Sequence, residues 1–521
     1  MRCRRSAQAA ALLTLGLVAS VSSATGQARS NYEELQTFSN VLNLIRINYV
    51  DSVTYTAMVR AAVDGVLRML DPHSRFVPSE AVRWEAAIAR GDLASVGLVL
   101  EDVDGAATVL AVTPGSPAAR RGVAPGDRLV EIGDTTVAGR DAKQLERALA
   151  GQPASRVTIT LERGHRLEPV RYRVTVRREV IRHQSVGVHR MVDDSTGYVR
   201  LVDFASGAVE DVEKAVGRMR GSGASRLLLD LRGNPGGNVV AAVEVAALFL
   251  PRYTVVFRTQ GRKHDQDESY VTKSEGRFRD LPMIVLVDAS TASAAELVAA
   301  SLQDHDRALV VGQRTFGKAL VQVPFPLPSG DVVWLTVGWV FSPSGRLIQR
   351  RYAGLAPEAY RTLAGRPGTA DTLVPFRTDA GREVRGRGGV GPDVEVPVPP
   401  HCPAWHAIAS DSLFDQAVAD SVAFALPDSD AARSEWIASP GRWREQVLAL
   451  YLARVRSRLG VTAEVDDALA DVLARELAAR VAEVRWGADA RDDLLLRHDP
   501  VLGASLAQFP RLPELLASPT K

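Results

Sequence analysis

Cysteine is almost absent from this chain of 521 residues, which contains only Cys3 and Cys402. Cys3 lies in an N-terminal leader that we expect to be removed, so the mature chain would keep one cysteine. One cysteine can form neither an intramolecular disulfide nor a zinc cluster. The composition therefore excludes a disulfide-stabilised fold, and Cys402 is interpreted as an incidental thiol.

The chain also lacks a strong net charge and any long apolar run beyond its N-terminus. Its 63 basic and 61 acidic residues give a net charge of +2, which indicates neither nucleic acid nor an anionic membrane as a partner. A membrane-spanning helix needs about 20 consecutive apolar residues, so we predict no stable membrane span. Hydrophobic residues make up 46% of the chain, as in globular proteins with substantial cores.

The first 28 residues have the pattern of a secretory signal peptide. Three arginines among the first five residues precede an apolar stretch at residues 9–19, and small residues follow it. The apolar stretch is too short to span a bilayer comfortably. We predict cleavage near Ala24 or Ala28, and export to the periplasm or another extracytoplasmic compartment. A disordered or membrane-anchoring N-terminus is the alternative.

Changes in sequence pattern divide the mature chain into four parts. Apolar residues at helical spacing predict helices in most of residues 29–90. Residues 91–178 contain short strand-like runs separated by glycine turns. Strands alternate with helices in residues 179–399, which implies βαβ units and a layered α/β sheet. Residues 400–521 contain amphipathic helical segments, which could support dimerisation, dock a partner or brace the core.

Three stretches are expected to interrupt these patterns. Residues 71–80 contain Asp-Pro and Val-Pro pairs, which favour a loop. The polar residues 258–280 are expected to form a solvent-exposed hairpin or loop. The residues 351–392, rich in Arg, Gly and Pro, are interpreted as an irregular insert.

Ser293 is the first candidate for chemistry, because it stands where an apolar strand at 283–287 gives way to a helix. Amides at a helix N-terminus are unpaired and favour developing negative charge, so a hydroxyl nucleophile there would have an oxyanion donor nearby. Serine is also a preferred helix N-cap, which is the plain structural alternative. No G-x-S-x-G motif surrounds Ser293, and His305 lies beyond the following helix. An ordinary Ser-His-Asp hydrolase therefore has little support.

Lys318 is the better candidate for a general base. It follows a buried strand at 308–311 and a glycine-flanked turn, and Gln322 lies four residues further on. A lysine acts as a base only if its pKa falls from about 10.4 towards neutrality, which desolvation by apolar neighbours can cause. Ser-Lys dyads are an established variant of the catalytic triad. The alternative is a solvated loop lysine.

Two glycine-rich segments need interpretation. The turn "RGNPGG" (232–237) follows a buried strand, and its consecutive glycines would let backbone amides approach a ligand, as an oxyanion hole requires. A phosphate site could look similar, but the Gly-Lys-Ser/Thr ending of a P-loop is missing. The segment "GRGGVG" (386–391) matches a dinucleotide motif, yet it follows no clear strand and runs into Pro392 instead of a helix. We therefore reject a dinucleotide site, and one "RGRGG" copy is poor support for RNA binding.

Taken together, the motifs resemble those of the C-terminal processing (tail-specific) serine proteases, enzymes of bacteria and plastids. The resemblance covers about residues 30–400. The segment "VGLVLEDVDGAATVLAVTPGSPAARRGVAPGDRLVEIGD" is similar to the PDZ domain of that family. "LRGNPGG", "STASAAE" and "GQRTFGKALVQ" resemble its glycine turn, nucleophile segment and lysine segment, in the same order.

The resemblance implies a fold of class α/β, with a crotonase/ClpP-like α/β core and an inserted, mainly-β PDZ domain. In this chain the PDZ domain would occupy residues 91–178 and the protease core 179–399. A helical segment at 29–90 and a helical region at 400–521 would flank them. The region after 400 lies outside the resemblance, and its role stays open.

The resemblance also implies roles for single residues. Ser293 would attack the scissile carbonyl, Lys318 would accept its proton and Gln322 would position the lysine. Asp304 matches an acidic position proposed to support the dyad, although we expect a structural role for it at the C-terminus of a helix. The resemblance implies further that the oxyanion would be bound by the amides of Gly236, Gly237 and Ala294. The substrate's terminal carboxylate would be bound by the backbone of Val96, Gly97 and Leu98.

We therefore predict an exported serine endopeptidase that cleaves proteins recognised by their C-terminal tails, without a metal or organic cofactor. Its partners would be protein or peptide substrates and no nucleic acid, and a homodimer or an adaptor stays open. Two alternatives come from other classes: a catalytically silent PDZ scaffold that binds peptides, and a crotonase-type acyl-CoA enzyme. The export signal and the inserted peptide-binding module disfavour the second.

Overall fold

The computed structural model describes residues 32–517 except for residues 91, 104–105, 114, 125, 164–169, 182, 264–266, 356–358, 361–374, 398–421, 424 and 454–465. The predicted signal peptide and both cysteines lie outside the described residues. The chain forms two compact units. One comprises Met1–Val77 and Pro324–Leu335, and the other comprises Pro78–Val323 and Thr336–Lys521.

The first unit is mainly helical. A helix at residues 32–48 precedes α2 (Tyr55–Leu70), whose first turn is capped by the Thr54 side chain. Strand β1 (Arg75–Val77) pairs antiparallel with the beginning of β16 (Val332–Phe341). The helices agree with the prediction. The predicted loop at 71–80 is wrong in part, because it contains β1 and the start of α3 (Ser79–Ala89); a three-residue strand depends on a distant partner strand and leaves little local pattern.

The mainly-β part of the second unit is a twisted antiparallel sheet closed by one helix. The sheet order is β2-β3-β4-β6-β7, with β5 beside β4. Helix α4 (Ala142–Leu149) begins at Asp141, whose side chain accepts the Lys143 amide, and buries Leu145 and Leu149 against the sheet. The strands are β2 (Leu98–Val103), β3 (Ala106–Val112), β4 (Arg128–Ile132), β5 (Thr135–Thr136), β6 (Arg156–Arg163) and β7 (Val170–Arg177).

A second sheet of six strands forms the centre of the α/β part. Its order is β19-β14-β13-β10-β9-β8, and all neighbours are parallel except β8 and β9. Parallel strands covered on both faces are largely apolar, as "MIVLV" and the three leucines of "RLLLD" are in this chain. The strands are β8 (Val186–Met191), β9 (Thr196–Leu201), β10 (Arg226–Asp230), β13 (Met283–Val287), β14 (Leu309–Gly312) and β19 (Val394–Glu395).

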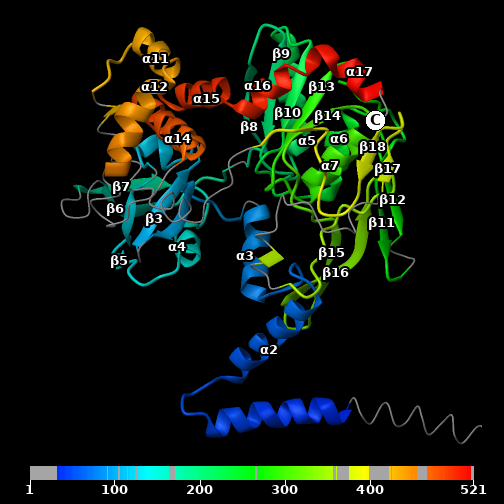
Figure 1. The fold of residues 1–521 in the computed structure, drawn as a ribbon. Helices are drawn as coiled ribbons and strands as arrows, with labels where there is room; N and C mark the ends of the chain where they lie inside the picture. Colours follow the sequence, from blue (N-terminus) through cyan, green and yellow to red (C-terminus); the bar gives the residue numbers. More distant parts are fainter. Residues whose placement is uncertain are drawn as a thin grey trace, which may run out of the picture. The chain divides into compact units, whose positions relative to one another are not determined.

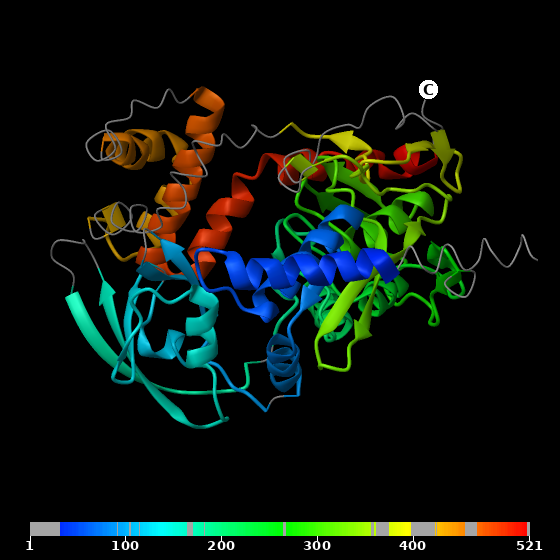
Figure 2. The same ribbon diagram turned by 90° about the horizontal axis from the view of Figure 1, so that it is seen from below.

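Helices cover both faces of this sheet (Figure 1). On one face lie α5 (Ala208–Gly221), α6 (Val239–Ala247) and α7 (Ala294–Asp304), which form the largest apolar core with the strands. The last segments of the chain, α16 (Pro500–Leu506) and α17 (Leu512–Ala517), pack on the other face. Figures 1 and 2 show these two helices in red beside the green strands. The end of the C-terminal region therefore braces the core.

Two smaller hairpins accompany the central sheet. Strands β11 (Val255–Gly261) and β12 (Glu268–Val271) form the first, which overlaps the stretch at 258–280 predicted as a hairpin or loop, and β11 also pairs with the end of β16. Strands β17 (Pro375–Arg377) and β18 (Glu383–Arg385) form the second. The stretch at 351–392 is thus less irregular than predicted, and a strand does precede "GRGGVG". The segment leads to β19 and not to a helix, so the dinucleotide motif still fails.

The rest of the C-terminal region is a separate helical cluster. Its core holds Trp436, Trp443 and Tyr451. The indole N–H of Trp436 donates to the Ala478 carbonyl at 3.1 Å, and that of Trp443 to the Trp436 carbonyl at 2.9 Å. The helices are α11 (Asp430–Ile437), α12 (Pro440–Arg442), a π-helical turn (Trp443–Leu448), α14 (Asp467–Trp486) and α15 (Ala488–Arg497). Among the described helices, none has the length and apolarity needed to cross a membrane.

The packing of α16 on the central sheet can be tested with Leu502→Ala. Leu502 is buried with Leu228, Leu286 and Leu309, so its truncation should lower the free energy of unfolding by about 2–5 kcal/mol. Glu514→Ala, on the exposed side of α17, is the control and should change stability little. Thermal unfolding followed by circular dichroism measures both. Equal stability of the two variants would contradict this packing.

Candidate active site

Ser293 lies in the turn between β13 and α7, as the sequence predicts. Its backbone has φ 56° and ψ −122°, a region that L-amino acids rarely occupy. Such a conformation costs of order 1–3 kcal/mol and persists only where the surrounding structure imposes it. Strain at a strand-to-helix turn is known from serine nucleophiles, where it exposes the hydroxyl.

Side chains around Asp288 impose this turn. The Asp288 carboxylate accepts the amides of Ser290 at 3.0 Å, Thr291 at 2.9 Å and Gly233 at 3.0 Å. The hydroxyl of Thr291 is fully buried and donates to the Leu231 carbonyl at 2.9 Å. These bonds join the nucleophile turn to the glycine turn after β10. Thr291 therefore has a structural role.

The glycine turn lies directly against Ser293. A Cβ atom placed on Gly236 would come within 2.8 Å of the Ser293 Cβ, the Ala294 nitrogen and the Ala292 carbonyl oxygen. Gly236 also has φ 96°, which favours glycine. Glycine at this position therefore allows the turn to approach Ser293 and the Ala294 amide more closely than any side chain would permit.

Asn234 sets the position of the glycine turn. Its completely buried side chain donates to the Leu201 carbonyl at 2.9 Å and accepts the Gly236 amide at 2.8 Å. Its own carbonyl accepts the Ala292 amide at 2.9 Å. Among the three predicted oxyanion donors, Gly236 thus directs its amide at Asn234 in this structure. Gly237 has φ 145° and packs against the Phe204 backbone.

Lys318 lies in the turn between β14 and β15 (Leu320–Pro326), with buried Ala319 and Leu320 beside it. The turn is joined to the nucleophile segment, because the Phe316 amide donates to the Thr291 carbonyl at 2.9 Å. The Lys318 side chain is half-buried, and Gln322 follows on β15. The structure thus brings Ser293, Gly236 and the lysine turn together.

Glu296, on the first turn of α7, links the segment of Ser293 to the segment of Lys318. One of its carboxylate oxygens accepts the Ser293 amide at 2.9 Å and the Lys318 amide at 2.8 Å. The other accepts the Gly317 amide at 2.7 Å and the Thr315 hydroxyl at 2.5 Å. The backbones of the predicted nucleophile and the predicted base therefore lie within hydrogen-bonding distance of a single atom.

Two opposing effects act on the pKa of Glu296. The side chain is completely buried, and this desolvation raises its pKa to about 7, while the four hydrogen bonds act in the opposite direction. All four backbone and side-chain groups donate, which suits the ionised carboxylate. The pKa of Glu296 therefore depends on the hydrogen bonds that it accepts from the segments of Ser293 and Lys318.

Sequence reasoning missed Glu296 although it stands within the quoted "STASAAE". The spacing of Ser293 and Glu296 is that of a helix capping box, which was the available signal.

The role of "GRGGVG" was also missed. A Cβ on Gly389 would lie 2.3 Å from the Thr315 carbonyl oxygen, and the Val390 amide donates to the Thr315 hydroxyl at 2.7 Å. This glycine segment backs the lysine turn.

Asp304 lies at the opposite end of α7 from Ser293. A helix of eleven residues is about 16 Å long, so the carboxylate does not reach the nucleophile. Asp304 forms an ion pair with Arg346 at 2.8 Å, with both side chains 1% exposed, and accepts the hydroxyl of Ser342 at 2.5 Å. These contacts agree with the expected structural role.

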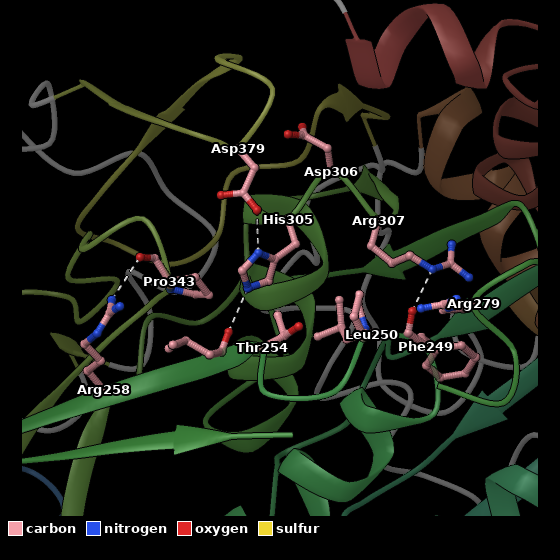
Figure 3. A pocket seen from close by; sticks show the side chains of 12 residues that line it. Phe249, Leu250, Thr254, Arg258, Arg279, His305, Asp306, Arg307, Pro343 and Asp379 are labelled. Atoms are coloured by element: carbon pink, nitrogen blue, oxygen red, sulfur yellow. Dashed lines mark hydrogen bonds and ion pairs between the residues drawn. The ribbon is translucent and has the colours of Figure 1, made fainter. Parts of the chain in front are cut away.

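His305 follows the last residue of α7, at the end of the helix opposite to Ser293, and both of its ring nitrogens have hydrogen-bond partners (Figure 3). It borders a cavity of about 650 Å³ that contains none of the predicted catalytic residues. Its Nδ1 lies 2.7 Å from the Asp379 carboxylate and its Nε2 2.7 Å from the Val255 carbonyl. These contacts leave Lys318 as the better candidate base. Within the described residues, no group of three or more His, Cys, Asp or Glu side chains could hold a metal ion.

The predicted tail-binding residues lie in the mainly-β part, at the start of its edge strand β2. Val96 is buried, and its carbonyl accepts the Ala118 amide at 3.0 Å. Gly97 has φ 85°, and a Cβ there would lie 2.3 Å from the Ser116 Cβ. The loop is therefore packed closely against residues 116–118 before it enters β2 at Leu98.

Comparison with known proteins finds one family model that matches the α/β part of the chain and another that matches the mainly-β part. The model of peptidase family S41 matches residues 195–360, and a PDZ domain model matches residues 108–163. The chain is 33% identical over 288 residues to the carboxyl-terminal-processing protease of Picosynechococcus sp., which covers 54% of this chain and 68% of the relative. It is 28% identical to the carboxy-terminal-processing protease of Bartonella bacilliformis, over 66% of this chain and 78% of the relative.

Among solved structures, the chain is similar to a photosystem II D1 C-terminal processing protease. The sequence identity is 24% and the TM-score 0.39, over 69% of this chain and 87% of the other.

The state of Glu296 predicts a pH dependence of stability. Its pKa is about 7 in the folded chain against an ordinary value of 4.5, so between these values the folded chain binds more protons. The free energy of unfolding should therefore fall by up to about 3 kcal/mol as the pH rises from 4.5 to 7. Denaturant unfolding across this range should show the fall in the wild type.

Glu296→Gln cannot ionise and should lose this dependence, whereas Glu210→Gln, an exposed glutamate on α5, should keep it. Parallel pH profiles for the wild type and Glu296→Gln would show that Glu296 does not titrate in this range.

Proposed function

This chain belongs to the carboxyl-terminal-processing proteases of peptidase family S41, and we propose that Ser293 and Lys318 form its catalytic dyad. The observation that carries this proposal is the convergence of both backbones on Glu296. The two segments are separated in the sequence, and their hydrogen bonds to Glu296 fix their positions relative to each other. A buried carboxylate that accepts four hydrogen bonds is a specific arrangement. Two of its donors are the backbone amides of the candidate nucleophile and the candidate base.

In the proposed reaction, the Ser293 Oγ attacks the scissile carbonyl while neutral Lys318 takes its proton. The tetrahedral intermediate collapses to an acyl-enzyme as the lysine Nζ passes that proton to the leaving amine. Water then attacks the ester with Lys318 again acting as the base, and the serine hydroxyl is restored. Gln322, four residues along β15, would orient the lysine.

For the oxyanion we propose the amides of Ala294 and Gly237 as donors. The close approach of Gly236 to the Ala294 nitrogen supports this, because a side chain at Gly236 would collide with that amide and would exclude a substrate carbonyl oxygen from it. Gly236 would serve as a third donor only after its amide leaves Asn234. Its main contribution would be the absence of a side chain.

The PDZ domain would select the substrate. We propose that a protein's C-terminal tail adds to the edge of β2 as a further strand, with its carboxylate at Val96, Gly97 and Leu98. The domains would be a signal peptide at 1–28, a helical segment at 29–90, the PDZ domain at 91–178, a crotonase/ClpP-like protease core at 179–399 and a helical region at 400–521. The signal peptide would direct the enzyme out of the cytoplasm.

The dyad is tested with Ser293→Ala and Lys318→Ala in the mature chain. Each should reduce cleavage of an unstructured protein substrate by about 1000-fold or more, because neither the nucleophile nor its base can be replaced by the remaining groups. Ser290→Ala removes the exposed hydroxyl three residues earlier, and Lys214→Ala removes an exposed lysine of α5. Both controls should cleave normally.

Gel analysis of substrates ending in small apolar residues or in Asp-Asp would also report tail selection, with slower cleavage of the acidic tail. Full activity of either dyad variant would refute the Ser-Lys mechanism. Binding of the apolar tail without any cleavage by the wild type would instead favour the silent scaffold.

Gly236→Ala tests the oxyanion geometry. A methyl group there would crowd the Ala294 amide and would require an unfavourable φ, so kcat should fall by about 100-fold. Gly217→Ala, in α5 with open space around it, is the matched control and should leave kcat and KM unchanged. Unchanged kcat for Gly236→Ala, with the thermal stability of the wild type, would refute the proposed position of the oxyanion.

A further inference from the structure

One carboxylate already occupies the edge to which a substrate tail would add. β2 is the edge strand of the PDZ sheet, and the Leu100 amide on this edge donates to the Glu146 carboxylate at 3.0 Å. The side chains of Leu98 and Leu100 are both buried in the domain core. The amide that Glu146 accepts is thus one of the donors that an added strand would use.

Glu146 reaches this amide from α4. Its neighbours Leu145 and Leu149 are anchored in the same core as Leu98 and Leu100, which fixes the helix beside the strand. Glu146 is half-buried, and within the described residues it forms no ion pair. The neighbouring Arg147 guanidinium lies over the Trp84 ring instead, 5.7 Å from its centroid. The carboxylate is therefore held by a backbone amide and lacks a cationic partner there.

The position of Leu100 identifies the part of the tail that would meet Glu146. If the tail's carboxylate lies at the start of β2, the tail runs antiparallel to that strand. Leu98 would then face the last residue, and Leu100, two residues on, the third-last. In a hydrogen-bonded antiparallel pair the opposed residues exchange their amide and carbonyl bonds, and their side chains lie on the same face. The third-last side chain would therefore point towards α4.

We propose that Glu146 gates the tail-binding groove and selects tails with lysine or arginine as the third-last residue. This inference rests on the proposed role of Val96, Gly97 and Leu98 in tail recognition. An entering tail takes the Leu100 amide for its own carbonyl and displaces the carboxylate. A half-buried carboxylate that loses its donor is costly unless a cation replaces it. A basic third-last residue supplies that cation on the correct face.

The test uses the full mature chain with Ser293→Ala, so that bound tails are not cut. Fluorescence anisotropy measures the affinity for short labelled peptides that differ only in a third-last alanine, lysine or glutamate, and for the lysine peptide with an amidated C-terminus. The lysine tail should bind about tenfold more tightly than the alanine tail, and the glutamate tail more weakly than both.

Two variants separate gating from charge selection. Glu146→Ala frees the Leu100 amide and should bind the alanine tail about fivefold more tightly, without a preference for lysine. Glu146→Gln should also lose the preference, but its amide oxygen still accepts the Leu100 amide, so the alanine tail should bind as in the wild type. Asp134→Asn, an exposed carboxylate in the turn between β4 and β5, is the matched control and should keep both the lysine preference and the wild-type affinity.

A lysine preference that survives in both Glu146 variants, or an alanine tail that binds Glu146→Ala no more tightly, would overturn the gate while leaving tail recognition intact. Equal binding of the amidated peptide, or no binding of any tail, would overturn tail recognition and the gate with it. Thermal unfolding shows whether Glu146→Ala folds. If it does not, the presence or loss of the lysine preference in Glu146→Gln decides whether Glu146 selects the tail.

Discussion

The candidate site depends on the buried carboxylate of Glu296. Removing an ionised carboxylate from water costs several kcal/mol even after relaxation, and the charge is tolerated only where donors surround it. Here the amides of Ser293, Gly317 and Lys318 and the hydroxyl of Thr315 supply four hydrogen bonds. Displacing the turn of Ser293 or the turn of Lys318 would leave the carboxylate with unsatisfied lone pairs. The cost of burial thus becomes a constraint that holds the two turns together.

The surrounding structure makes this constraint rigid. Thr315 is held by the Val390 backbone, and Asn234 joins the glycine turn to Ala292. Both turns leave the same edge of a parallel sheet whose two faces are covered, one by α5, α6 and α7 and the other by α16 and α17. The unfavourable φ of Ser293 is sustained because its neighbours on both sides have fixed hydrogen-bond partners.

Local signals predicted the parts of this site and missed the interactions between them. Apolar strands such as "MIVLV" reveal themselves because both of their faces are buried, and Ser293 and Lys318 follow such strands. Glu296 gave only a capping signal, since most of its partners are backbone amides, which any sequence carries. The packing of α16 was unpredictable for a related reason: an amphipathic pattern reveals an apolar face but not the surface that it covers. Short strands such as β1 exist only because a distant strand pairs with them.

The same interaction, a glutamate that accepts backbone amides, occurs at two places with opposite consequences. Glu296 is completely buried and has four donors, so an incoming group would have to replace all of them at once. Glu146 is half-buried at the edge of a sheet, and the Leu100 amide that it accepts is a donor that an extended peptide can use equally well. The tail carbonyl would replace Glu146 at the Leu100 amide, and a cation on the tail would compensate the displaced carboxylate, whereas Glu296 would lose four donors at once. Burial and the number of donors therefore decide which carboxylate fixes the structure and which one regulates access to it.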